Sequence, residues 1–485
     1  MSARPDAPTG ARGGRPPLRY RRPRVRADAG AARLPTAAGP DALNGTSAPE
    51  GGAGAGRRRA VVTALALFLL AVVVFAGGFR YTAYVDATGV RYNGSGDTVP
   101  NELLPILILQ HGTLRFDSFV DRSKPLDYFI SYVDGHYVSA YPIVPGLFNI
   151  PVYAVAIVLG VDLLQKALYL SLLTSIVLSA LSVALIYACL RRVCRDERTA
   201  VGFALIYAGG TAVWSVASRG IWQHAPSLLL LNAALALLLS GSRRWLPFAG
   251  LALGLAVWNR PTNICLAAPL AVYVLLHHRP LFVRFAVLAA IPAALLAAYS
   301  LSFWGSLAAL GQAHEVGGFS GHFWPGLLGL LFSPNRGLFV FSPIFVFAAL
   351  GVWNRKAQRN DDPISLCLAF SVVALVLVYS KWSMWWGGHS FGYRLLIEAV
   401  PPLMLLLARA WEVALARRTL WRVAFAAALA WSVYVHALGA TYSPCGFNLQ
   451  PNDVDQHTER LWDVRAGELA RCTARLAAGA GVATP

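Results

Sequence analysis

Charged side chains are scarce in this chain, and their scarcity excludes an ordinary soluble domain. Asp, Glu, Lys and Arg together make up 14% of the 485 residues, against 56% for hydrophobic residues. Soluble domains carry roughly 25% charged residues. The hydrophobic residues fall into separate blocks of about 20, a length that crosses a hydrocarbon core of about 30 Å as a helix. The sequence therefore predicts an all-α polytopic membrane protein.

The motifs of several common enzyme classes are also missing. The chain has no Walker lysine loop, no Rossmann glycine fingerprint, no HExxH and no paired CxxC, so nucleotide chemistry and a tight zinc site lack support. Histidines 224, 314, 322 and 389 are scattered and not set at ligand spacing, which favours a loop role over metal binding. We therefore expect no required cofactor and no metal ligand set, with a divalent cation optional.

The net charge of +18 is unevenly distributed, because residues 1–59 hold 12 Arg against 4 acidic residues and so carry +8. This segment is rich in Pro, Gly and Ala and has no periodic apolar pattern. It is therefore predicted to be a disordered basic tail over residues 1–56, not a nucleic-acid-binding fold. Arginines beside a span keep their flank in the cytoplasm. Arg57, Arg58 and Arg59 thus place the N-terminus in the cytoplasm, close to membrane lipids.

The apolar runs and the basic turns together predict a topology of eleven spans. Counting 141–160 as a span would put the basic cluster 191–198 on the outer face. The three prolines of 141–160 instead favour a helix that lies at the outer rim. With that run left out, the later basic turns fall inside. The spans are expected at 60–78, 164–190, 200–217, 226–241, 245–260, 263–277, 284–303, 338–353, 363–380, 395–411 and 420–438.

This topology divides the chain into three parts. Residues 57–438 form the membrane domain, and its first extracytoplasmic loop, 79–163, carries juxtamembrane helices. Residues 439–485 form a small extracytoplasmic cap. The unusual polar and aromatic residues collect on the outer face, whereas the inner loops are short and basic. The outer face is therefore the expected working surface.

The first outer loop is centred on Asp97. Glycines 94 and 96 allow a sharp turn before this aspartate. Asp97 or Thr98 can cap the apolar helix that follows, which His111 and Gly112 would end. A helix cap is thus one interpretation of Asp97. A functional acid is the other, because Asp97 lies beside an apolar helix at the outer mouth of the membrane domain.

Several cations are expected at the outer ends of the predicted spans: Lys166, Arg219, Arg260, Arg336, Lys381 and Arg394. For most of them, a long side chain that extends to the membrane interface is a sufficient explanation. That explanation suits Arg336 and Arg394 less well, because glycines and tryptophans frame them. An acid and cations beside lipid favour group transfer from a lipid-linked phosphate. Asp97 can accept the proton of an acceptor hydroxyl, while Arg336, Arg394 and Lys381 hold the departing phosphate.

The aromatic and histidine residues of the outer loops have two interpretations. Trp222 and His224 stand at a predicted helix entrance, where a cap or belt role is as plausible as a place in a substrate cleft. Trp385 and Trp386 fit an aromatic belt, but two glycines follow them and can open a cleft in which a ring stacks on a sugar. His389, in the same loop, is a further cleft candidate.

The remaining acids of the outer face are more simply structural. Glu398 lies four residues after Arg394, so we expect the two to pair on one helix face, with a place in the cleft as the alternative. Asp117, Asp121 and Asp127 are expected to be solvated loop acids. A smaller expectation is that Asp117 helps to bind an acceptor or a cation.

Several outer motifs resemble one superfamily of membrane enzymes. They are Gly96-Asp97-Thr98, Tyr137-Val138-Ser139-Ala140-Tyr141-Pro142, Trp222-Gln223-His224, Ser333-Pro334-Asn335-Arg336-Gly337 and Trp385-Trp386-Gly387-Gly388-His389-Ser390-Phe391-Gly392-Tyr393-Arg394. Over about residues 60–465 the chain resembles the GT-C glycosyltransferases that use polyprenyl-phosphate sugars, such as the protein mannosyltransferases and the aminoarabinose transferase of lipid A. A group of bacterial members is the more similar one.

The resemblance implies both a fold and a reaction. The fold would be a GT-C-like bundle in a plasma (bacterial inner) membrane. The reaction would move a sugar from a polyprenyl-phosphate donor to an acceptor hydroxyl on the extracytoplasmic face, with inversion and with Asp97 as the general base. The acceptor can be a glycan, a lipid or a protein. Tyr393 stands where the family motif more often has proline.

Two other functions compete with this one. A lipid or solute transporter would be expected to show corresponding broken helices in two halves and charges near the middle of the membrane. The sequence shows no such repeat, and its charges gather at the outer rim. A non-catalytic subunit of a cell-envelope assembly complex is the second alternative.

Cysteine usage makes a prediction for the C-terminal cap. Of the six cysteines, only Cys445 and Cys472 fall outside in this topology, and an oxidising compartment favours a disulfide between them. Two unrelated thiols are the alternative, because sequence does not give their separation. The other four, Cys189, Cys194, Cys265 and Cys367, are expected to be free thiols.

Overall fold

The computed structural model describes residues 51–77, 83–85, 91–93, 96–120, 128–307, 318–353, 363–443 and 445–478. The predicted tail therefore lies almost wholly outside the described residues, as do Asp121, Asp127 and His314. Residues 1–55 and residues 56–485 are separate units.

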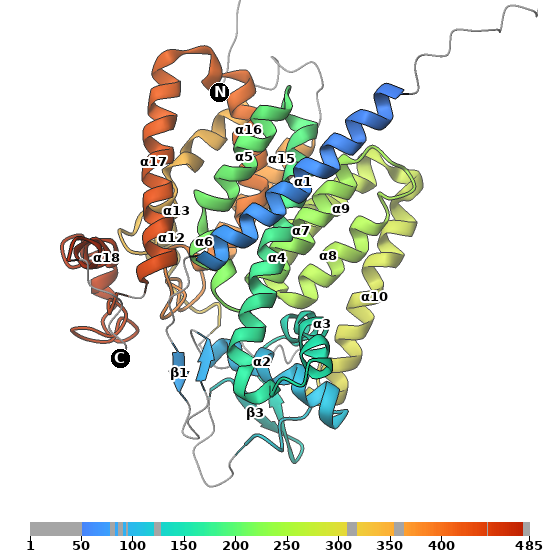
Figure 1. Cartoon of the computed structure of the whole chain (residues 1–485), viewed down its shortest axis with the longest axis vertical. Coiled ribbons are helices and arrows are strands. Elements are labelled where there is room, and N and C mark those ends of the chain that lie inside the picture. The colour runs from blue at the N-terminus through green and yellow to red at the C-terminus, as the bar shows by residue number, and fades with distance from the viewer. Residues whose placement is uncertain are drawn as a thin grey trace, which may run out of the picture. The chain divides into compact units, whose positions relative to one another are not determined.

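Helices dominate the described part of the chain (Figure 1), which confirms the predicted fold class. The longer ones are α1 (Gly51–Gly77), α3 (Val144–Val158), α4 (Leu163–Val193), α5 (Glu197–Gly209), α7 (His224–Leu239), α8 (Phe248–Asn259), α9 (Ile264–His277), α10 (Arg279–Trp304), α12 (Phe323–Phe332), α15 (Ile364–Tyr379), α16 (Val400–Val413), α17 (Thr419–Tyr442) and α18 (Glu468–Ala477).

Short helical pieces and two hairpins make up the remaining regular structure of the described residues. The α-helical and π-helical pieces are α2 (Val99–Ile106), η2 (Leu107–His111), α6 (Ala212–Ser215), α13 (Leu338–Phe341) and α14 (Ala348–Trp353). The 3-10 helices are η1 (Gly96–Thr98), η3 (Ala217–Arg219), η4 (Pro261–Asn263), η5 (Pro343–Phe347), η7 (Arg394–Ala399), η8 (Leu415–Arg417) and η9 (Thr458–Trp462). The antiparallel hairpins are β1 (Ala83–Val85) with β2 (Arg91–Asn93), and β3 (Ile130–Val133) with β4 (His136–Ser139).

Within the described ranges, five helical segments are long and apolar enough to cross a membrane: 56–77, α4, α10, 394–417 and α17. Shorter apolar helices accompany them, and each of the eleven predicted spans coincides with helix. Several are short or broken. The predicted span 338–353 is interrupted at Ser342, since Pro343 cannot donate to the hydrogen-bond ladder of α13. The chain is a multi-pass membrane protein whose bundle includes short and interrupted helices.

Small residues bring some of these helices together. In α8, glycines 250 and 254 are four residues apart, and an added Cβ would lie 2.1 Å from the carbonyl oxygen of Phe285 and 2.7 Å from that of Ala289. Both carbonyls belong to α10. Inside a membrane, close backbone packing of this kind holds helices together, because lipid is as apolar as the side chains. A larger residue at either glycine would push α8 and α10 apart.

The segment predicted as the first outer loop forms a layer at one end of the bundle, where α2, α3 and the β3–β4 hairpin lie together (Figure 1). Its apolar residues form a hydrophobic cluster that Trp258 of α8 joins. Two side-chain bonds join α2 to α3: Asn101 Oδ1 accepts from the amide of Gly146 at 3.2 Å, and Asn149 donates to the Asn101 carbonyl at 2.8 Å. As predicted, the helical segment ends at Gly112, which adopts a φ of 62°.

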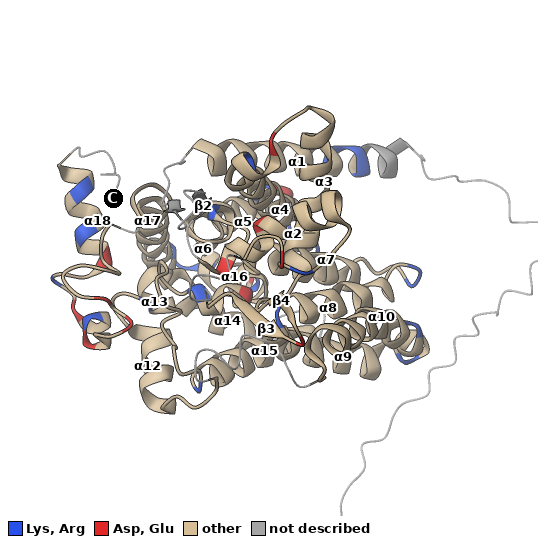
Figure 2. Ribbon diagram, turned by 90° about the horizontal axis from the view of Figure 1, so that it is seen from below, with Lys and Arg blue, Asp and Glu red and all other residues tan. Residues whose placement is uncertain are grey.

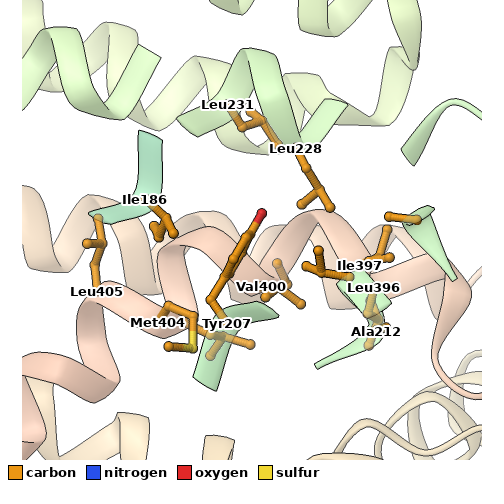
Figure 3. Packing of buried hydrophobic residues seen from close by; sticks show 14 of the residues in the cluster. Ile186, Tyr207, Ala212, Leu228, Leu231, Leu396, Ile397, Val400, Met404 and Leu405 are labelled. Carbon is orange, nitrogen blue, oxygen red and sulfur yellow. The ribbon is translucent and has the colours of Figure 1, made fainter. Parts of the chain in front are cut away.

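The segment 394–417 lies in the middle of the packed core. Figure 3 shows Leu396, Ile397, Val400, Met404 and Leu405 among side chains of other helices. The partners labelled there come from α4, α5, α6 and α7, and are Ile186, Tyr207, Ala212, Leu228 and Leu231. This packing surrounds the backbone that carries Arg394 and Glu398.

The C-terminal cap contains the predicted cysteine pair. Cys445 and Cys472 form a disulfide with their Cα atoms 5.3 Å apart, while Cys189, Cys194, Cys265 and Cys367 are in no disulfide, as predicted. The bridge ties α18 to the end of α17, which α18 also contacts.

We expect Cys472→Ser to loosen the cap. The bridge spans 27 positions, and closing a loop of that size stabilises a fold by about 3 to 4 kcal/mol. Hydrogen exchange of the full chain should therefore show faster exchange across α18. Cys367→Ser, which makes the same change at a cysteine of α15 that is in no disulfide, is the matched control and should leave α18 protected. Unchanged exchange of α18 in Cys472→Ser would contradict the prediction.

Candidate active site

The Asp97 carboxylate lies among polar side chains from distant segments of the chain. Tyr128 and Tyr141 donate hydroxyl hydrogen bonds to its Oδ1 at 2.9 and 3.0 Å, and Arg394 Nη2 donates to its Oδ2 at 2.5 Å. The N-cap of α2 is Thr98, which makes no side-chain cap hydrogen bond. Helix capping therefore does not explain the position of the carboxylate.

The glycine before Asp97 makes this arrangement possible. A Cβ at Gly96 would lie 2.4 Å from the hydroxyl of Tyr128, so a side chain there would displace the tyrosine from the carboxylate. Seen from the end of the bundle, acidic and basic segments lie together near the middle of the view, beside α16, while most of the ribbon there is uncharged (Figure 2). The charges of the site are thus concentrated in a mainly apolar bundle.

The surroundings of Asp97 keep it ionised. Burial opposes its charge, but Arg394 and the hydrogen bonds from Arg394, Tyr128 and Tyr141 outweigh burial and hold the pKa of Asp97 below its usual value. Burial and the charge of Asp97 raise the pKa of Tyr141, so that this hydroxyl stays protonated and donates. The side chain of Asp97 remains 17% exposed. An anion is therefore held at a site that retains some access.

A buried row of polar side chains lies behind Arg394. Arg394 Nε is 3.2 Å from His224 Nε2, and His224 Nδ1 is 2.8 Å from Glu398 Oε1. Arg260 Nη1 lies 2.9 and 3.0 Å from the two Glu398 oxygens. Arginine can only donate, so His224 accepts at Nε2 and carries its proton on Nδ1, which donates to Glu398. The 2.8 Å approach of Arg260 Nη1 to the same Nδ1 is then a contact between two donors that share one carboxylate.

The charged side chains of this row form two ion pairs. Asp97 pairs with Arg394, and Glu398 pairs with Arg260, whose guanidinium also lies 5.2 Å from the Tyr379 ring centroid. Buried charges are tolerated when each has a partner and further hydrogen bonds. His224, neutral in this tautomer, joins the two ion pairs and orients Arg394.

The predicted pairing of Glu398 with Arg394 is wrong, and helix geometry gives the reason. The two residues begin and nearly end η7, a 3-10 helix. With three residues per turn, positions four apart point in directions about 120° apart, whereas in an α-helix they share a face. Glu398 therefore turns toward Arg260 and His224, and Arg394 toward Asp97.

Arg394 is also positioned by its neighbours. Its guanidinium carbon lies 5.2 Å from the ring centroid of Trp222, as in a cation–π contact. The hydroxyl of the preceding Tyr393 accepts from the Ala212 amide at 3.1 Å and lies 2.8 Å from Ser342 Oγ. Tyr393, at the position where the related motif more often has proline, anchors the backbone beside Arg394 in the core.

The structure does not bring Arg336 to this cluster. Its side chain is 1% exposed, and Nη1 and Nη2 donate to Glu468 Oε2 at 2.9 Å and to Asn448 Oδ1 at 2.8 Å. Nε donates to the carbonyl of Trp386 at 3.1 Å. These contacts join the 386–388 loop to the C-terminal cap, whose described residues include 445–478. Sequence could not show this, because Glu468 is 132 positions away.

The predicted cleft tryptophans of the same loop also face the cap. Trp385 and Trp386 are 8% and 9% exposed. The Trp385 ring lies 6.4 Å from that of Trp462, and Trp386 Nε1 donates to Asp455 Oδ1 at 2.7 Å. The contacts of these tryptophans thus join the loop to the cap.

Lys381, the third residue predicted to hold the phosphate, is exposed just after α15.

His389 meets two aspartates of the cap. Its Nε2 lies 2.9 Å from Asp453 Oδ1 and 3.5 Å from Asp455 Oδ2. The potential ligand atoms of the three residues all lie within 4.8 Å of one another. This spacing allows His389, Asp453 and Asp455 to hold a cation. His389 is therefore placed with acids of the cap.

Three residues of this cluster were not assigned to it from the sequence. Tyr141 belongs to one of the outer motifs and Arg260 is one of the outer cations, but neither was assigned to the site. Nothing in the sequence near Tyr128 pointed to this residue.

Asp117 accepts from the Tyr137 amide and from His136 Nδ1, both at 2.8 Å. Burial opposes its ionisation, but these hydrogen bonds lower the pKa of Asp117, as expected for an acid that holds the β3–β4 hairpin.

Comparison with protein families identifies one similar family. The family model described as dolichyl-phosphate-mannose-protein mannosyltransferase matches residues 145–304, which are 160 of the 485 residues. The matched part contains Trp222, His224 and Arg260, and it excludes Asp97 and Arg394. Over this part of the chain, the match confirms the resemblance predicted from the outer motifs. No match was found among curated proteins.

Three solved structures of the Archaeoglobus fulgidus oligosaccharyltransferase are similar in fold to this chain. They are a complex with Zn and sulfate (TM-score 0.46, 13% identity), the apo form (0.48, 14%) and a complex of AglB with an inhibitory peptide and a dolichol-phosphate (0.42, 14%). The alignments cover 82%, 83% and 83% of this chain. They cover 57%, 60% and 59% of those proteins, so this chain spans less than two thirds of their length.

Proposed function

We propose that this chain is a membrane glycosyltransferase that transfers a sugar from a polyprenyl-phosphate donor to an acceptor hydroxyl, with inversion. The observation that carries the proposal is the pair formed by Asp97 and Arg394. One side chain can accept a proton, and the other can bind a phosphate, at the end of an apolar bundle. The family-model match supports the donor class, since it is named for proteins that use dolichyl-phosphate-mannose.

The proposed reaction uses both members of the pair. The acceptor oxygen bonds to the anomeric carbon of the sugar while its proton passes to the Asp97 carboxylate. The bond from that carbon to the phosphate oxygen breaks, and the electron pair leaves with the polyprenyl phosphate. Arg394 stabilises this product through charge-assisted hydrogen bonds. Attack from the face opposite the phosphate inverts the anomeric carbon.

We also propose that the site faces the extracytoplasmic side of a plasma membrane. The loop that ends in Arg394 also carries Trp386, which is bonded to the disulfide-bearing cap, so the cap and the site share one end of the bundle. Disulfides form in oxidising compartments outside the cytoplasm. This supports a C-terminus outside and, with an odd number of spans, an N-terminus in the cytoplasm. The acceptor can be a glycan, a lipid or a protein.

Sugar transfer by the purified full chain tests the proposal. The protein in lipid nanodiscs is incubated with a panel of polyprenyl-phosphate sugars and candidate acceptors, and release of polyprenyl phosphate is measured. Donor-dependent release with an inverted glycosidic product is the expected result. Flux of a lipid or solute through proteoliposomes, without transfer from any donor, would favour a transporter. Activity that appears only in a partner protein would favour a non-catalytic subunit.

Arg394→Lys is expected to weaken the binding of a polyprenyl phosphate about tenfold. Lysine keeps the charge but loses the planar fork that matches phosphate oxygens. It also loses the separate Nε that contacts His224. Equilibrium binding of a short-chain polyprenyl phosphate measures the effect. Arg422→Lys, the same change at an exposed position in α17, is the control. Equal affinity in Arg394→Lys and the wild type would contradict the assignment.

A further inference from the structure

The Asp97 carboxylate of this structure is engaged in three hydrogen bonds. Oδ1 accepts from two tyrosines, and Oδ2 is held by Arg394 at 2.5 Å. A general base works best when its pKa lies near the working pH, whereas the arginine stabilises the ionised form and makes it a weaker base. The pair that keeps Asp97 charged therefore also keeps it from accepting a proton readily.

We propose that the donor phosphate activates Asp97 by taking Arg394 away from it, so that the base forms only after the donor has bound. This inference rests on the proposed function and adds an order to it. The phosphate and the carboxylate are both acceptors for the same guanidinium. The donor is thus both the substrate and the trigger for deprotonation of the acceptor.

The contacts of Arg394 allow such an exchange of partners. Its Nε bond to His224 and its position over the Trp222 ring hold the guanidinium independently of Asp97. Because the guanidinium is a rigid planar fork, it moves as a unit. A small shift of the whole group can exchange Oδ2 for a phosphate oxygen while Trp222 and His224 keep the side chain in the site. His224 is in turn held by Glu398, which Arg260 pairs with, deep in the core.

The contacts of Asp97 allow the exchange as well. Tyr128 and Tyr141 are neutral donors on Oδ1, so they keep the carboxylate in position after Arg394 leaves Oδ2. The surrounding burial, which disfavours a charged carboxylate, is then no longer offset by a cation. Oδ2 becomes both free and more basic, and it points toward the place that Arg394 and the phosphate occupy.

Binding of a sugar-free polyprenyl monophosphate tests this inference. The wild type must separate Arg394 from Asp97 before the guanidinium can bind phosphate, and its apparent affinity is reduced by the small fraction in which the pair is open. Asp97→Asn removes the competing charge. We expect this variant, in nanodiscs, to bind a short-chain polyprenyl monophosphate about tenfold more tightly than the wild type. Asp97→Ala should show the same direction, whereas Asp97→Glu retains the charge and should not gain affinity.

Asp117→Asn is the matched control, because it makes the same chemical change in the same outer loop at an acid bonded to His136 and Tyr137. It should bind the monophosphate as the wild type does. Equal or weaker binding by both Asp97→Asn and Asp97→Ala would overturn the exchange while leaving the donor class intact. If neither the wild type nor any Asp97 variant bound the monophosphate, the donor class itself would fall, and the inference with it.

Discussion

Asp97→Asn is expected to lower the rate of sugar transfer by about 10² or more, the largest effect on activity that the structure predicts. The carboxamide keeps the shape of the side chain but cannot take the proton of an acceptor hydroxyl. The measurement is turnover at saturating donor and acceptor, once a donor has been found. Folding should be preserved, since the amide oxygen can still accept from Tyr128, Tyr141 or Arg394.

The control for this prediction is again Asp117→Asn, which should retain turnover close to that of the wild type. An Asp97→Asn enzyme with normal turnover would leave the aspartate as a structural partner of Arg394. A combination of slow turnover with tighter phosphate binding would separate the proton transfer from donor recognition, because only the first needs a carboxylate.

Arg260→Met is expected to have the largest effect on stability. The side chain of Glu398 is 1% exposed and that of Arg260 is 9% exposed. Removing one partner of such a buried pair leaves an uncompensated charge and costs about 3 to 5 kcal/mol. The free energy of unfolding of the full chain, measured by denaturant titration in mixed micelles, should fall by that amount.

The double variant Arg260→Met with Glu398→Gln is the matched comparison, because it removes both charges. It should be less destabilised than Arg260→Met, since no buried carboxylate is then left without a cation. An equal loss in the single and the double variant would show that packing of the arginine stem, and not its charge, stabilises this part of the core.

Much of the membrane architecture follows from local sequence. Apolar blocks of sufficient length must be helical in lipid, because the backbone can satisfy its hydrogen bonds only internally. This made the helices predictable to within several residues and gave their positions along the chain. The end of the first outer helix at Gly112 and the pairing of Cys445 with Cys472 were likewise accessible, because a glycine in a left-handed conformation and two cysteines on one side of a membrane are local or topological signals.

Three assignments around the arginines could not be made in this way. The i,i+4 prediction for Glu398 assumed an α-helix, but the core imposes a 3-10 helix at 394–399. Arg336 was predicted to bind phosphate because glycines and tryptophans frame it, yet its guanidinium is bound by the cap. Tyr128 joined the site although nothing near it in sequence marked it, because Gly96 leaves room for its hydroxyl.

The sequence alone determined the class of the protein, since composition and apolar block length depend on nothing beyond the chain itself. It also singled out Asp97 and Arg394, because a charge at the edge of an apolar segment needs a reason. Only the tertiary structure decided which charges meet. Asp97 and Arg394 are 297 positions apart, and Glu398 and Arg260 are 138 apart. Partners at such separations are selected by how the helices pack, because an ion pair depends on distance in space and not along the chain.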